Sequence, residues 1–148
     1  MILVIDLSVL RHACEVGGEL CLACLFAILK NPNISVKHHE EWTTEFNKIS
    51  LSDEVMGWKT EMQNARRFVA SERGVKHPFT HVLDTEVKRH PRLCLLTMAY
   101  LSDKVVLYCA LYGPECKQLT NISHPNLASI EWKEIHSTPN IEHWLTSL

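Results

Sequence analysis

The sequence of 148 residues lacks any apolar run long enough to span a membrane. Its longest run, Leu20 to Leu29, has ten residues, whereas a membrane-spanning helix needs about 20. The N-terminus lacks the basic segment of a secretory signal, and Asp6 interrupts its apolar residues. Internal repeats, linkers and low-complexity segments are also missing. These absences predict a single cytoplasmic domain over residues 1–148, with no membrane contact.

The sequence also has few glycines and a small net charge. The five glycines form no phosphate-binding loop, which argues against a doubly wound domain that binds a nucleotide or phosphate ligand. A net charge of −2 argues against a general polyanion binder but leaves room for a local basic patch. The densest patch is Lys88-Arg89-His90-Pro91-Arg92. We therefore predict that Lys88, Arg89 and Arg92 contact a nucleic-acid backbone.

The six cysteines do not indicate a disulfide framework, because a chain of this length can bury a core and no export signal is expected. Cys21 and Cys24 form a Cys-x-x-Cys pair inside the longest apolar run. A zinc site would need two more thiol or imidazole ligands at matching spacing, and the sequence holds no second pair of that kind. We expect both cysteines to be free thiols of the core.

The first residues of the chain carry the clearest functional signal. An unbroken apolar run leads into Asp6, as in a parallel strand that is buried on both faces. Ligands of open α/β sheets bind at the carboxyl ends of strands, and Asp6 stands at such an end. Ser8 is expected to cap the helix that follows. The alternative is that Asp6 is an exposed residue that only ends a strand and starts a turn.

Apolar patterning predicts the remaining elements. The expected helices cover residues 8–15, 19–30, 53–73, 93–101 and 141–148, and the expected strands cover residues 34–36, 116–119 and 129–132. A further helix is expected around Trp42 and Phe46, with Glu41 early in it. Ser102 is expected to cap another helix that has Asp103 in its first turn and ends at Gly113-Pro114.

Three acidic residues are predicted to converge. Glu41 and Asp103 could each simply stabilise the start of a helix through its dipole. Together with Asp6, however, they would place three carboxylates near the carboxyl edge of one parallel sheet, where they repel unless a divalent cation lies among them. Mg²⁺ and Mn²⁺ prefer oxygen ligands and keep several waters, which suits metal-assisted attack on a phosphodiester.

At these residues the chain resembles the PIN domain family, which are small metal-dependent ribonucleases that are often toxins of toxin–antitoxin pairs. The resemblance lies in the segments "VIDLSVL", "HHEEWTTEF", "SDKVVLYCAL" and "IEWKEIHSTPN…HWL". It implies an α/β fold of three layers, α/β/α, with a central, mostly parallel sheet. It also implies that Asp6, Glu41 and Asp103 are catalytic ligands of Mg²⁺ or Mn²⁺, that the substrate is RNA, and that the partners are an antitoxin and a second copy of the chain.

The sequence departs from the family at one acidic position. Another Asp usually follows the late strand, and the corresponding residue here is Asn121, which offers an oxygen but no charge. We assign Ser8 and Asn121 as supporting residues. Two hypotheses follow: an active metal-dependent endoribonuclease, or a catalytically degenerate PIN-like domain that binds nucleic acid or protein. Because the family also contains DNA nucleases, RNA itself is an expectation.

Overall fold

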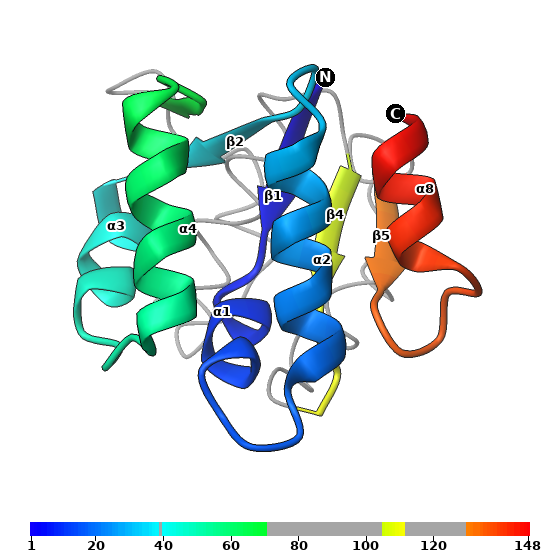
Figure 1. Ribbon diagram of the computed structural model, residues 1–148, viewed down its shortest axis with the longest axis horizontal. Helices are drawn as coiled ribbons and strands as arrows, with labels where there is room; N and C mark the ends of the chain where they lie inside the picture. The colour runs from blue at the N-terminus through cyan, green and yellow to red at the C-terminus, as the bar shows by residue number, and fades with distance from the viewer. Residues whose placement is uncertain (39, 71–104, 112–129) are drawn as a thin grey trace, which may run out of the picture.

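The computed structural model describes residues 1–38, 40–70, 105–111 and 130–148 (Figure 1). The elements in chain order are β1 (Ile2–Ile5), α1 (Leu7–Ala13), α2 (Glu19–Lys30), β2 (Ser35–His38), α3 (Glu40–Asn47), α4 (Asp53–Asn64), β3 (Phe68–Ala70), β4 (Val105–Tyr108), β5 (Glu131–Glu134) and α8 (Ile141–Ser147). Among these helices, none is both long enough and apolar enough to cross a membrane.

The five strands form one parallel sheet in the order β3-β2-β1-β4-β5. β1 lies at its centre, where Leu3 pairs with Val36 on one side and with Val105 on the other. The predicted α/β class is confirmed, and the parallel sheet with its helices is consistent with a three-layer α/β fold. The strand order reverses between β1 and β4, which makes their carboxyl ends the topological switch point of the sheet.

The core is built around β1 and the helix α2. Leu3, Val4 and Ile5 have no exposed surface, as predicted for a strand covered on both faces. Helix α2 packs against α4 on one side and α8 on the other, so these three helices lie side by side over one face of the sheet (Figure 1). Its buried Leu25 and Ile28 each stabilise the fold by about 1.5–3 kcal/mol.

The prediction of a helix over residues 53–73 is wrong beyond Asn64. Helix α4 ends there in a Schellman motif, in which the backbone N–H of Arg66 donates to Gln63 and that of Arg67 donates to Met62. Arg66 adopts the left-handed conformation (φ 55°) that usually calls for glycine, so the sequence carries no obvious stop signal. The chain then enters β3, which pairs with β2.

The helix expected to run from Asp103 to the Gly113-Pro114 turn is also wrong, because residues 105–108 form the buried strand β4. A short apolar run cannot be assigned to a helix or a strand by periodicity alone. The β-branched Val105 and Val106 favour a strand, and the ladder to β1 fixes it. The helix expected over residues 93–101 and the strand expected over residues 116–119 lie outside the described residues.

Candidate functional site

Asp6 lies directly after β1, at the switch point of the sheet. It is fully buried, which excludes the alternative of an exposed turn residue. Its backbone N–H donates to Leu107 of β4 (2.8 Å), and its Oδ2 accepts the N–H of Ser8 (3.0 Å). Asp6 therefore is the N-cap of α1, and the expectation that Ser8 would cap this helix is wrong.

Ser8 instead joins the carboxyl ends of the two central strands. Its buried hydroxyl accepts the backbone N–H of Cys109, the first residue after β4, at 3.0 Å. A hydroxyl that accepts one hydrogen bond still has its own proton to donate. Ser8 thus lies at the predicted edge of the sheet, in the first turn of α1 and close to Asp6.

Helix α3, which contains Glu41, is attached to the same strand end. The indole N–H of the buried Trp42 donates to the carbonyl of Ile5, the residue before Asp6, at 2.9 Å. Because α3 follows β2 immediately, its first turn lies at the carboxyl end of β2. The remaining predicted site residues lie outside the described residues: Asp103, Asn121, Lys88, Arg89 and Arg92.

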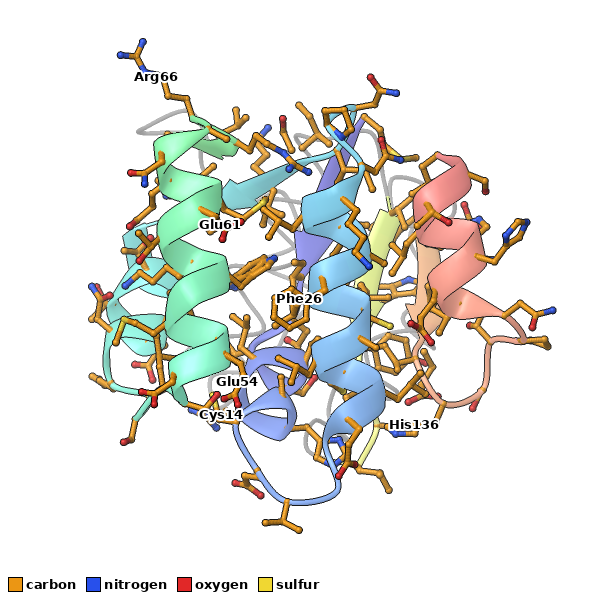
Figure 2. All side chains as sticks on the ribbon, viewed as in Figure 1. Cys14, Phe26, Glu54, Glu61, Arg66 and His136 are labelled. Carbon is orange, nitrogen blue, oxygen red and sulfur yellow. The ribbon has the colours of Figure 1, made fainter. Side chains whose placement is uncertain are left out.

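A second group of side chains meets at the same edge and was not predicted as a site. His12 of α1, Cys21 of α2, Cys109 after β4, and Glu134 and His136 at the end of β5 form what we call the Cys109 cluster. His12 Nδ1 lies 3.4 Å from Cys109 Sγ and 3.6 Å from Cys21 Sγ. On the other side, His136 Nδ1 lies 3.8 Å from Cys109 Sγ. Figure 2 shows His136 beside the N-terminal end of α2.

The inner part of the Cys109 cluster is closed to water. His12, Cys21 and Cys109 are buried, whereas the His136 side chain is 33% exposed. Burial and the neighbouring Cys109 thiol raise the pKa of Cys21, and burial raises the pKa of Cys24 to about 12. The predicted free thiols are confirmed for the described cysteines, Cys14, Cys21, Cys24 and Cys109.

The geometry does not match a catalytic Cys–His–Glu triad. Such a triad uses the two different nitrogens of its imidazole, one toward the nucleophile and one toward the carboxylate. In the Cys109 cluster, Cys109 Sγ and Glu134 Oε1 both approach Nδ1 of His136, at 3.8 and 3.5 Å.

Glu134 is held in place as a carboxylate. Burial alone would raise its pKa, but hydrogen bonds from the backbone N–H groups of Ala110 and Ser137, with His136 nearby, hold the pKa of Glu134 below its usual range. Its backbone carbonyl also accepts the hydroxyl of Thr138 at 2.7 Å. Glu134 thereby fixes the turn that carries His136.

This geometry predicts a pH-dependent contribution of Glu134 to stability. Because its pKa is lowered in the folded state, the stabilisation is complete above the ordinary glutamate pKa of about 4.3 and is lost as the pH falls through the folded pKa. We expect Glu134→Gln to cost about 1–3 kcal/mol at pH 7 and little in acid. Urea unfolding between pH 7 and 3 measures this.

The control for that experiment is Glu131→Gln on the same strand. Glu131 is half exposed and pairs with Lys133 at 2.9 Å on the surface. An exposed pair of this kind contributes up to about 1 kcal/mol, so the control should follow the wild type. Equal acid sensitivity of wild type and Glu134→Gln would contradict the prediction.

A pocket of about 210 Å³ lies between α3, α4 and β3. Aromatic and polar side chains line it: His38, Trp42, Thr43, Phe46, Asn47, Lys59, Gln63 and Phe68. Lys59 Nζ lies 4.9 Å from the centroid of the Phe46 ring, a cation–π distance. Among the side chains that the structure describes, this lining holds a cation and no carboxylate, which does not favour a Mg²⁺ or Mn²⁺ ion.

Among known proteins, no family model, no curated protein and no solved structure matches the chain. The resemblance to the PIN domain family therefore depends on the four sequence segments, and it stays a prediction.

Proposed function

We propose that the chain is a PIN-like endoribonuclease that hydrolyses RNA phosphodiester bonds with Mg²⁺ or Mn²⁺ at the carboxyl edge of its sheet. The observation that supports this proposal best is the place of Asp6. It is a buried carboxylate at the end of the central strand and at the switch point, with the helix of Glu41 attached one residue away.

In this proposal Asp6, Glu41 and Asp103 would be the metal ligands, because carboxylate oxygens are what Mg²⁺ and Mn²⁺ prefer. When bound, the metal supplies charge stabilisation and a more acidic water. The protein's own part is positional: the N–H of Ser8 orients the Asp6 carboxylate. In this proposal Ser8 and Asn121 would support the site through hydrogen bonds or water. Lys88, Arg89 and Arg92 would contact the RNA backbone.

The cellular setting belongs to the same proposal. As a PIN-like toxin the chain would act in the cytoplasm, form a homodimer and be inhibited by an antitoxin protein.

The test is Asp6→Asn, measured with and without Mn²⁺. The amide oxygen of asparagine can still accept the Ser8 N–H, so the cap and the fold should survive while the ligand charge is lost. We expect wild type to cleave labelled single-stranded RNA and to be stabilised by about 2.7 kcal/mol at Mn²⁺ concentrations a hundredfold above Kd. In Asp6→Asn, both effects should disappear.

Asp53→Asn is the matched control, because Asp53 is an exposed carboxylate in the first turn of α4. It should keep both cleavage and the Mn²⁺ shift. Cleavage that survives in Asp6→Asn would remove Asp6 from the metal site and sink the proposal.

One observation favours the second candidate, a catalytically degenerate PIN-like domain that serves as a binding module. Asp6 is fully buried and caps α1, which is a structural role that requires no metal. If folded wild type shows neither an Mn²⁺ shift nor cleavage, this second function replaces the first.

A further inference from the structure

We propose that His12, Cys21, Cys109 and His136 bind one zinc ion in the Cys109 cluster, between α1, α2 and the carboxyl ends of β4 and β5. This inference does not depend on the nuclease proposal, since it uses other residues and a different class of metal.

The distances fit zinc coordination. With Zn–S bonds of about 2.3 Å and Zn–N bonds of about 2.0–2.1 Å, a tetrahedral site holds sulfur and nitrogen ligand atoms roughly 3.5 Å apart. His12 Nδ1 lies 3.6 Å from Cys21 Sγ and 3.4 Å from Cys109 Sγ, and these three ligand atoms all lie within 4.8 Å of one another. The protein therefore already brings three ligands around a common point.

The fourth ligand comes from the partly exposed side of the cluster. His136 Nδ1 lies 3.8 Å from Cys109 Sγ but groups with Cys109 and Glu134 rather than with His12 and Cys21, so its imidazole, which is 33% exposed, would have to turn toward the ion. Glu134 Oε1 lies 3.5 Å from that same Nδ1 atom, and it would orient the ring as the carboxylates of histidine–zinc sites do only when the zinc is bound through the other nitrogen, Nε2.

Hydrogen bonds also join these atoms, since the Cys21 thiol bonds to Cys109 as well. A single imidazole nitrogen carries either one proton or one lone pair, so it forms one good hydrogen bond. His12 Nδ1, however, faces two buried sulfurs. A zinc ion would satisfy all three atoms at once, and two thiolates would balance its charge, which suits a buried site.

The ligand chemistry selects the metal class. Two thiolates and two imidazoles form a soft S₂N₂ set, which favours Zn²⁺ over Mg²⁺ or Mn²⁺. Four protein ligands leave no open position, which is typical of structural rather than catalytic zinc. The ion would thus join two helices to the ends of two strands.

The experiment uses the full chain, expressed with added zinc, dialysed and analysed for metal by mass spectrometry. We expect about one zinc per chain and a lower Tm after chelation. Replacement by Co²⁺ should give the thiolate-to-cobalt absorption band together with the visible bands of tetrahedral Co²⁺. Cys109→Ser should lose the bound zinc and at least half of the thiolate band, and His136→Ala should weaken zinc binding at least tenfold.

Cys24→Ser is the matched control. Cys24 lies one turn after Cys21 in α2 and is equally buried, but it is not among the residues of the Cys109 cluster. It should keep stoichiometric zinc and the full cobalt band. Asp6→Asn should also keep zinc, so a failure of the nuclease proposal leaves this result unaffected.

Two outcomes would overturn the zinc site. One is wild-type protein that contains no zinc and whose Tm is unchanged by zinc or cobalt. The other is Cys109→Ser that retains stoichiometric zinc. If Cys109→Ser does not fold, alkylation of the wild type decides: zinc should protect Cys21 and Cys109 but not Cys14, and equal protection of all three would contradict the site.

Discussion

Replacing Arg67 with alanine is expected to lower the free energy of unfolding by about 3–5 kcal/mol, which is a large fraction of the stability of a domain of this size. The Arg67 guanidinium is buried and donates to four backbone carbonyls. Nε donates to Ile34 (2.8 Å), Nη1 to Leu29 (2.7 Å), and Nη2 to Ile28 and to Asn31 (2.6 Å). Without it, all four carbonyls lose a charge-assisted donor, although Ile28 and Asn31 still accept the backbone N–H groups of Asn31 and Ile34.

The expected loss of stability is this large because Arg67 binds the backbone at the C-terminal end of α2. The last carbonyls of a helix have no partner within the helix. Here Arg67, the residue that precedes β3, donates hydrogen bonds to carbonyls at the end of α2. Burial lowers the pKa of Arg67, yet an arginine side chain stays charged, so its hydrogen bonds remain charge-assisted. Arg67→Lys should lose an intermediate amount, because an ammonium group cannot reproduce the planar fork.

Urea unfolding of Arg67→Ala, Arg67→Lys and Arg66→Ala measures the effect. Arg66 is exposed, and Figure 2 shows its side chain extending away from the molecule. Its truncation should stay within about 0.5 kcal/mol of wild type. Unfolding midpoints that coincide for Arg66→Ala and Arg67→Ala would show that the guanidinium does not hold α2.

Gly18→Ala should be the second most damaging substitution, with a loss of about 3 kcal/mol or more. Gly18 precedes α2, and a Cβ at this position would lie 2.6 Å from the carbonyl carbon of His12, and closer still to its oxygen. Because the obstacle is backbone, no side-chain rotation can relieve the clash. The end of α1 and the start of α2 would have to separate.

Gly57→Ala is the paired measurement, with an effect of opposite sign. Gly57 lies inside α4, and a Cβ there would meet no atom within 4 Å. Alanine should stabilise this helix by roughly 0.5–1 kcal/mol. Thermal melts of both variants check the pair, and a Gly18→Ala variant as stable as Gly57→Ala would disprove the close approach of α1 and α2.

Much of the fold could be predicted where local signals agreed. The helix over residues 19–30 was predicted within its true bounds, because Gly17-Gly18 precede it and Asn31-Pro32 follow it. Prediction failed where the signal was absent or ambiguous. Arg66 ends α4 in a conformation usually reserved for glycine, and Val105–Tyr108 is too short for periodicity to separate a buried strand from a helix.

The candidate site could likewise be predicted only in part. Asp6 was predictable because a buried strand and its terminal carboxylate are adjacent in sequence. The Cys109 cluster was not, because His12 and Cys109 are 97 residues apart and only the strand order brings them together. Reading residues 105–108 as a strand would have provided the signal, since Cys109 would then follow a second strand at the edge occupied by Asp6.

The central place of β1 also imposes an order on folding during synthesis. β1 can pair with β2 early, but its other edge must wait for β4, because Leu3 pairs with Val105. At about 5–20 residues per second, this wait lasts roughly 5–20 s. During that time the nascent chain presents an apolar, unpaired strand edge, which is a template for intermolecular pairing. Chaperone dependence and loss of yield on rapid overexpression are therefore expected of this topology.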